Sequence, residues 1–160
     1  MLQHLFILYL DYLNHHHPDL LLEWRLAGAL HETIEQQLDQ FRPLLDKGST
    51  EEIHPDDIVQ QCLNELIAEL PPSRFDYITE VLSTEFEQQH EQLLSSGLLP
   101  YECMNLLQHC KPVFDKMNFS LLKEDDPFIR YAVIAAISEY FKREQEQVSN
   151  AVQYSTTINA

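Results

Sequence analysis

Three consecutive histidines, His15, His16 and His17, stand directly before Pro18 and are the first residues of the chain that could do chemistry. Imidazole is a common zinc ligand, but ligands that share one ion on a regular helix are three or four residues apart. Neighbouring residues on a helix point about 100° apart, so adjacent imidazoles cannot chelate one ion together. The triplet therefore predicts a helix end, where the helix dipole favours a partly charged histidine, and no metal site is expected there.

Two pairs, Glu51 with His54 and Glu87 with His90, have the E-x-x-H spacing of dimetal carboxylate bundles. His54 directly precedes a proline at an expected helix start, so that pair does not lie within a helix. In the helix expected over residues 73–94, His90 falls at the flank of the apolar stripe and Glu87 well off it. A core metal site needs both side chains to point inward, so no metal site and no cofactor are predicted.

The three cysteines, Cys62, Cys103 and Cys110, are an odd number without a C-x-x-C pair. This usage favours reduced thiols in a cytoplasm over a disulfide framework. Cys103 and Cys110 share a helix face with leucines, the usual place for small buried hydrophobic residues. His109 could lower the pKa of a neighbouring thiol, but no third group is available to orient a nucleophile.

The remaining polar pattern is typical of a helix surface. His31 and Glu35 are four residues apart and are expected to form a surface pair of small energetic weight. The chain has no G-x-S-x-G, phosphate loop, dinucleotide fingerprint or H-E-x-x-H, and three glycines leave little material for such loops. No catalytic or cofactor-binding residue is predicted.

Charge restricts the possible partners. The chain of 160 residues has 26 acidic and 10 basic residues, a formal net charge of -16. With the exception of the neighbours Lys142 and Arg143, its basic residues are scattered singly along the chain. This disfavours direct binding to nucleic acid or to an anionic membrane surface, because both need clustered cations. The acidity is interpreted as solubilising or, alternatively, as attraction to a basic partner or mimicry of a nucleic-acid backbone.

The apolar run from Leu5 to Leu10 is too short to span a bilayer and lacks a cationic leader, so it predicts a buried helix.

The elements that carry these residues are expected to be helices, because no alternating strand pattern or fixed-period repeat is present. Prolines at Pro18, Pro55, Pro100 and Pro127 suit the first helical position, and Ser73 opens a capping box with an acid three residues later. Helices are predicted over about residues 3–15, 18–40, 55–70, 73–94, 100–117 with a break at Pro112, and 126–147. The fold class predicted is all-α, a compact domain of about six helices in an orthogonal or irregular bundle.

The second predicted helix carries an apolar stripe that should face the core, at Leu22, Leu26, Leu30, Ile34 and Leu38. The first and last helices are apolar around most of their circumference, which predicts burial on several sides or an oligomer interface. Residues 47–50 are expected to form a loop. Residues 1–148 are interpreted as a single helical domain and residues 149–160, which lack a core pattern, as a polar flexible tail.

Several short motifs suggest a family: His17-Pro18-Asp19-Leu20, Trp24-Arg25 with Ala29, Phe75-Asp76-Tyr77 with Val81-Leu82 and Glu85-Phe86, and Val113-Phe114 with Lys116. On these motifs the chain resembles, over about residues 5–120, a small family of uncharacterised Bacteroidetes proteins, domain-of-unknown-function family eighteen ninety-six. The resemblance implies a helical cytoplasmic protein without an assigned activity, whose relatives look like passengers of conjugative elements. It also implies that His17-Pro18 is a helix start.

Three functions follow as hypotheses. The first is a non-enzymatic helical module for protein interaction or assembly, a homo-oligomer with a dimer favoured, whose acidic surface takes a basic protein partner. The second is a metal-dependent hydrolase or oxidase that uses histidine and carboxylate ligands. The third is an acidic accessory factor for the DNA-processing proteins of a mobile element.

Overall fold

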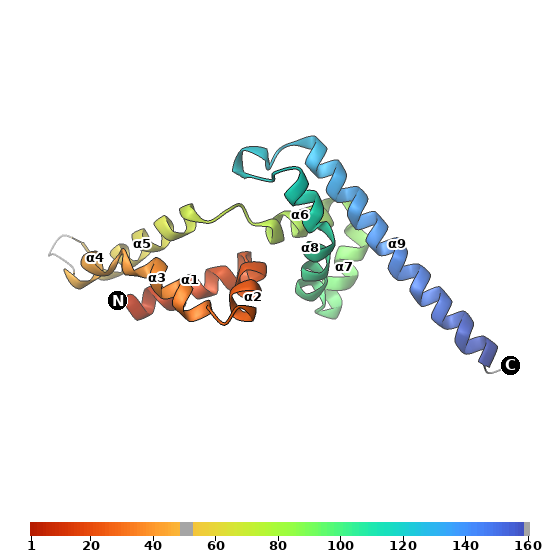
Figure 1. Ribbon diagram of the computed structural model, residues 1–160, viewed down its shortest axis with the longest axis horizontal. Coiled ribbons are helices and arrows are strands. Elements are labelled where there is room, and N and C mark those ends of the chain that lie inside the picture. The colour runs from red at the N-terminus through yellow and green to blue at the C-terminus, as the bar shows by residue number, and fades with distance from the viewer. Residues whose placement is uncertain (49–52, 159–160) are drawn as a thin grey trace. The chain divides into compact units, whose positions relative to one another are not determined.

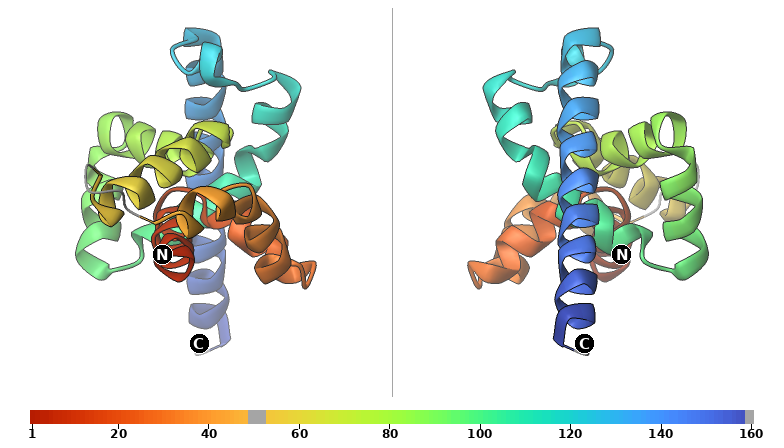
Figure 2. Two further views of the ribbon diagram at one scale, coloured as in Figure 1. Left: turned by 90° about the vertical axis from the view of Figure 1, so that its left-hand side faces the viewer. Right: turned by 90° about the vertical axis from the view of Figure 1, so that its right-hand side faces the viewer.

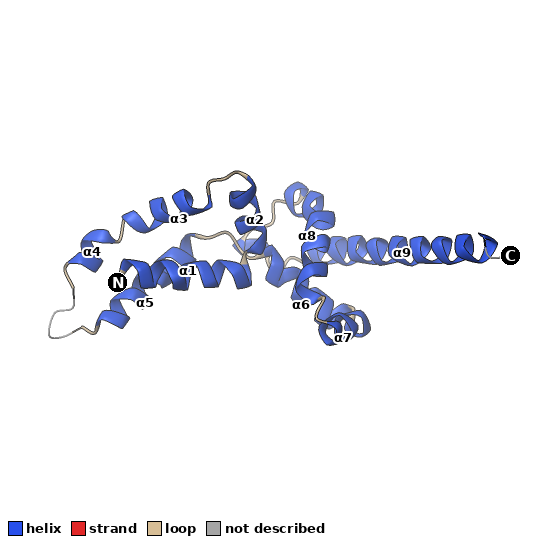
Figure 3. Cartoon of the chain, turned by 90° about the horizontal axis from the view of Figure 1, so that it is seen from below, coloured by secondary structure: helices blue, strands red, loops and turns tan. Residues whose placement is uncertain are grey.

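The computed structural model describes residues 1–48 and 53–158, and within these ranges the chain is helical, with nine α-helices, one 3₁₀ turn and no strand (Figures 1 and 3). The predicted all-α class is confirmed, but the helices number nine and not about six. The elements in chain order are α1 (Leu2–His16), α2 (Pro18–Leu26), α3 (Leu30–Asp39), α4 (Arg42–Asp46), α5 (Pro55–Glu69), α6 (Arg74–Glu85), α7 (Glu87–Ser96), α8 (Leu99–Lys116), η1 (Leu121–Lys123) and α9 (Pro127–Ile158).

The chain divides into two compact units, Met1–Phe75 and Asp76–Ala160. In the first unit, α1 packs against α5, α2 and α3. Leu5, Tyr9 and Leu13 recur every four residues on α1 and are completely or almost completely buried, so one stripe of α1 forms the centre of this core. The rest of α1 is less covered than its composition predicted, because Ile7 is 56% exposed.

A second-unit core is built mainly from α8 and α9, which pack along one another, with α7 against α8. Its buried side chains are Ile78, Val81, Leu82, Cys103, Leu106, Leu107, Cys110, Phe114, Ile129, Val133 and Ile137. The ring of Tyr77 packs edge-on against the rings of Phe114 and Phe119. This framework holds α7, α8 and the first turns of α9 in fixed register.

The predicted second helix is divided into two by Gly28. Its φ of +68° is left-handed, a conformation that glycine adopts without strain, and its N–H donates to the carbonyl of Arg25. The chain restarts as α3 at Leu30. The predicted core stripe is therefore wrong at Leu26, which lies at the end of α2 and is 80% exposed.

Two other predicted boundaries are wrong. The fourth predicted helix is interrupted at Phe86, whose φ of -134° is not helical, so α6 and α7 are separate. Conversely, Pro112 lies inside α8 without ending it. The buried side chains of Cys110 and Phe114 flank Pro112, and packing of this helix against its neighbours outweighs the hydrogen bond that proline cannot make.

The start of α9 follows the prediction, but the helix is longer than its apolar pattern. It runs for 32 residues and extends past the other helices of its unit (Figures 1 and 2). Residues 149–158, where the pattern predicted a flexible tail, are helical and exposed. Residues 159–160 and the loop residues Ser49 and Thr50 lie outside the described residues.

Candidate functional site

The histidine triplet is placed at the junction of α1 and α2. His15 and His16 end α1, and His17 is the residue between the two helices. His15 is exposed, with Nδ1 2.8 Å from the backbone oxygen of Asp11, whereas His17 is buried. The ring of His16 stacks near the ring of Tyr12, with centroids 4.5 Å apart. The ring of His17 also lies near Tyr12, with centroids 6.1 Å apart, and the position of the triplet between α1 and α2 agrees with the interpretation as a helix end.

The histidines of the two E-x-x-H pairs, His54 and His90, belong to different units of the chain. His54 is the N-cap of α5 and its Nδ1 accepts a 3.3 Å hydrogen bond from the N–H of Asp56, while Glu51 lies outside the described residues. Glu87 is exposed and His90 half-buried on α7, a helix without a fully buried side chain. Across residues 1–48 and 53–158, no three His, Cys, Asp or Glu side chains are grouped as metal ligands would be.

The three cysteines are free and buried. Burial raises the pKa of Cys110 to about 12, and burial also raises the pKa values of Cys62 and Cys103. His109 packs against the ring of Tyr140, with centroids 5.5 Å apart. These thiols are held in their neutral form, in which they are poor nucleophiles.

A cleft of about 1080 Å³ lies among α7, α8 and α9 of the second unit. Its wall has an apolar part and a part made of acids, amides and hydroxyls. The lining residues are Gln89, Gln92, Leu93, Ser96, Leu98, Glu102, Phe141, Glu144, Gln145, Gln147, Val148, Ser149 and Ala151. Together these side chains can bind an amphipathic ligand.

The most unusual group in this cleft is the carboxylate of Glu102. It is only 8% exposed, and Oε2 accepts a 3.3 Å hydrogen bond from Asn105 Nδ2. Among the residues that the structure describes, Oε1 has no hydrogen-bond partner. Glu102 lies in the first turn of α8, where the helix dipole favours a negative charge. A buried carboxylate oxygen without a donor costs free energy, so the site suggests an external donor.

Two side chains one turn apart on α9, Tyr140 and Glu144, interact with Glu102. Burial raises the pKa of the Glu144 carboxyl, and the negative charge of Glu102 raises it further. Burial likewise raises the pKa of the Tyr140 phenol, and Glu102 and Glu144 add to the effect. Hydrogen bonding to the Glu102 carboxylate contributes to the raised pKa of the phenol, but no donor, the phenol included, lies in hydrogen-bonding geometry to Oε1 among the described residues. The cleft thus holds two carboxylates that repel one another.

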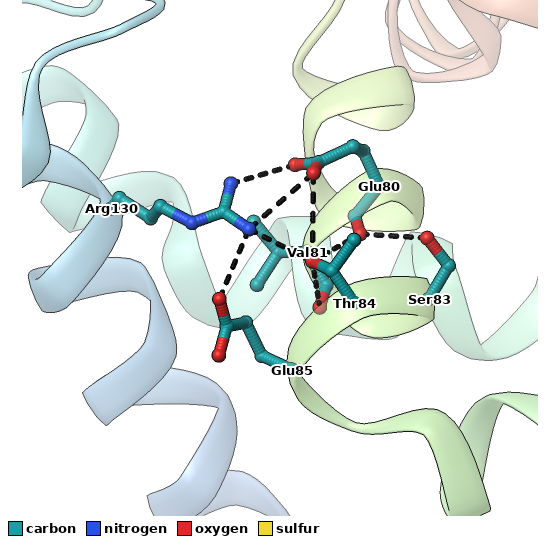
Figure 4. Close-up of polar contacts among 6 residues, drawn as sticks. All are labelled: Glu80, Val81, Ser83, Thr84, Glu85 and Arg130. Atoms are coloured by element: carbon teal, nitrogen blue, oxygen red, sulfur yellow. Dashed lines mark hydrogen bonds and ion pairs between the residues drawn. The ribbon is translucent and has the colours of Figure 1, made fainter.

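A second polar cluster in this unit shows how the fold compensates acidic groups. Arg130 of α9 reaches α6, where Nη1 is 2.7 Å from Glu80 Oε2 and Nη2 is 2.8 Å from Thr84 Oγ1 (Figure 4). Nη2 also lies 3.2 Å from Glu85 Oε1. One guanidinium therefore neutralises two carboxylates and ties the start of α9 to α6, a structural role.

The sequence contained no signal for the cleft. Glu102 looks like an ordinary acid in a helix's first turn, and Glu144 like part of the polar end of the last helix. Only the packing of α8 along α9 brings them together.

The expected surface pair of His31 and Glu35 is present, with Nε2 and Oε1 3.2 Å apart and both side chains exposed.

Comparisons with known proteins give no relative from which a role could be transferred: no family model, curated protein or solved structure matches the chain. The resemblance to the Bacteroidetes family therefore stays a prediction. None of the helices that the structure describes has the length and apolar content needed to cross a membrane.

Proposed function

We propose that this chain is a non-enzymatic protein-interaction module of the cytoplasm. Its docking surface is the cleft among α7, α8 and α9 together with the side of the distal part of α9 that carries Val148 and Val152; we call the two together the docking face. The docking face binds a protein partner. Membership of the Bacteroidetes family remains an expectation.

The observation that carries the proposal is the exposure of the distal part of α9. Every residue from 142 to 158 is exposed, and Val148, Val152, Tyr154 and Ile158 are each more than half exposed. A free helix of this length is marginal in water, and apolar side chains along it gain free energy when another surface covers them. Val148 also lines the cleft, and Val152 follows one turn later on the same side of α9, so these two residues extend the apolar surface of the cleft.

Charge supports a basic partner. The chain has 26 acidic residues against 10 basic ones, and a strong negative field accelerates encounter with a positively charged protein. A second acidic copy of this chain would meet repulsion at the same face. The homodimer expected from the sequence is therefore proposed to form elsewhere, through the exposed apolar side of α1 around Ile7.

A peptide-display selection tests the proposed function. The purified protein is offered a library of random 18-residue peptides, and binders are counter-selected on a variant with Val148→Glu and Val152→Glu. The matched control carries Asn150→Glu and Gln153→Glu, which add the same charges on the opposite side of α9, since residues on a helix are about 100° apart. We expect binders that the first variant loses and the control keeps. Binders that ignore both variants, or an empty selection, would contradict the proposal.

A further inference from the structure

The cleft contains a buried carboxylate, one oxygen of which has no hydrogen-bond partner among the described residues. Glu102 is more than nine-tenths buried, lines the cleft and leaves Oε1 without a donor. Glu144 is a second carboxylate in the same wall. Of the residues that line the cleft, all within the described ranges, none is lysine or arginine.

We propose that the cleft is a receptor for an arginine or lysine side chain presented by an amphipathic helix of the partner protein, with the cationic head between Glu102 and Glu144. This inference rests on the proposed function and names the chemistry of its partner. The bound guanidinium or ammonium group donates to Glu102 Oε1 and neutralises the repulsion between the two carboxylates.

The cations nearest in the sequence do not take this role. Arg143 precedes Glu144 directly, but its Nη2 lies 2.5 Å from Oε1 of Glu139, four residues earlier on the same helix. Lys142 lines a separate shallow depression with Gln145 and Glu146. Neither of these two residues provides a cation for the pair.

The same unit provides an internal example of this chemistry. Arg130 joins the two carboxylates of Glu80 and Glu85 with contacts of 2.7 to 3.3 Å across two helices. Glu80 and Glu85 both lie on α6, whereas Glu102 and Glu144 come from two packed helices, α8 and α9, and no arginine lines their cleft. The planar guanidinium, which donates in a fork, suits such a pair better than the compact ammonium of lysine.

The rest of the lining fits the remainder of a basic amphipathic helix. Leu93, Leu98, Phe141 and Val148 provide apolar surface for the methylene stem of an arginine and for apolar neighbours one turn away. Gln89, Gln92 and Gln145 offer amide groups to the polar side of such a helix. A peptide helix would contact the apolar and amide side chains as well as the carboxylates, whereas a bare cation would contact only the carboxylates.

The test uses one peptide from the display selection, resynthesised in four forms that differ at its central basic residue: arginine, lysine, glutamine and glutamate. Affinity for the full chain is measured by fluorescence anisotropy, with Glu102→Gln, Glu144→Gln and the control Glu146→Gln, whose side chain does not line the cleft. Circular dichroism verifies that each variant is folded. If Glu102→Gln does not fold because Glu102 is buried, Glu144→Gln still tests the proposal, since Glu144 is exposed.

We expect the arginine peptide to bind about ten-fold more tightly than the glutamine peptide, the size of one charge-assisted hydrogen bond. This preference should fall to about two-fold or less in Glu102→Gln or Glu144→Gln and persist in Glu146→Gln. Equal binding of all four peptides to the unmodified chain would overturn the cationic receptor and leave the proposed function standing. An empty display selection, which leaves no peptide to resynthesise, would overturn both. Loss of the arginine preference in one millimolar Ca²⁺ or Mg²⁺ would assign the pair to a divalent cation and also overturn the proposal.

Discussion

Replacing Glu144 with glutamine should stabilise the free protein at neutral pH. Glutamine keeps the size of the side chain but removes one of two carboxylates that repel across the cleft. Glu144 is exposed, so water and salt screen the repulsion and only a fraction of its nominal strength remains. We expect the free energy of unfolding to rise by about 0.5 kcal/mol, which corresponds to roughly 1–2 °C in Tm for a chain of this size.

The pH dependence of this effect has a definite sign. Because folding raises the pKa of the Glu144 carboxyl, its neutral form is favoured in the folded state. Stability linked to this group is fully present below the ordinary pKa of a glutamate and is lost as pH rises through the raised value. The variant lacks this titration, so its advantage over the unmodified chain should be largest at pH 7 and absent near pH 3.5.

Urea unfolding followed by circular dichroism at several pH values measures this difference. Glu146→Gln is the matched control, since it removes the same charge from the same helix outside the cleft. If Glu144→Gln destabilised the protein at pH 7, or if Glu146→Gln gave an equal gain, the repulsion between Glu102 and Glu144 would not be the cause and the reasoning would be refuted.

Four other results are expected. Arg130→Met should lower the free energy of unfolding, measured with urea, by about 1–2 kcal/mol, because the Arg130 side chain is only 29% exposed and joins two carboxylates. Arg143→Met, which removes a single exposed ion pair, should lower it by less than about 0.5 kcal/mol. Equal losses in the two variants would contradict the role of the Arg130 cluster. The native thiols, and Cys110 above all with its pKa of about 12, should react with a thiol reagent at pH 8 only after denaturation, so a fast native reaction would contradict the burial. Untagged protein should contain well under one equivalent of zinc, iron or manganese by elemental analysis, and stoichiometric metal that survives dialysis and is lost on changing His54 or His90 would contradict this expectation. Sedimentation at tens of micromolar should show a dimer that Ile7→Glu splits into folded monomers, whereas sedimentation of the unmodified chain as a monomer of 18.8 kDa would end the idea.

Local chemistry made part of the fold predictable. Pro18, Pro55 and Pro127 each begin a helix as predicted, because a proline at the first position loses no hydrogen bond. The apolar pattern also predicted correctly that the segments of α1 and α9 are helical, although only one side of each is buried and Ile7, Phe128 and Tyr131 are exposed. These signals depend on neighbours in the sequence.

The wrong boundaries arose where tertiary packing or backbone geometry decided the outcome. Gly28 could have continued a helix at modest cost, but it adopts a left-handed conformation and ends α2. Pro112 carries a strong local signal for a break, yet α8 continues through it because the helix is packed on both sides of the proline. Sequence signals at single residues do not report which of these effects is larger.

The candidate site was beyond local reasoning for a different reason. Its key feature is an oxygen of Glu102 that lacks a donor while Glu144 stands nearby on another helix. Neither residue has a distinctive spacing, and the pair exists only after α8 and α9 have packed. The exposed distal part of α9 was partly visible as a loss of apolar pattern, although the sequence suggested a flexible tail and not a helix.

Hydrogen–deuterium exchange of the full chain, with and without a saturating selected peptide, tests most directly that the cleft and the distal part of α9 form a docking face. In the free protein, amides in residues 142–158 should exchange fast, since every residue of this part of α9 is exposed. Peptide binding should slow exchange there and in α7 and the first turns of α8 by about ten-fold or more. Protection confined to residues 1–75, or unchanged exchange in 142–158 with peptide bound, would contradict the account.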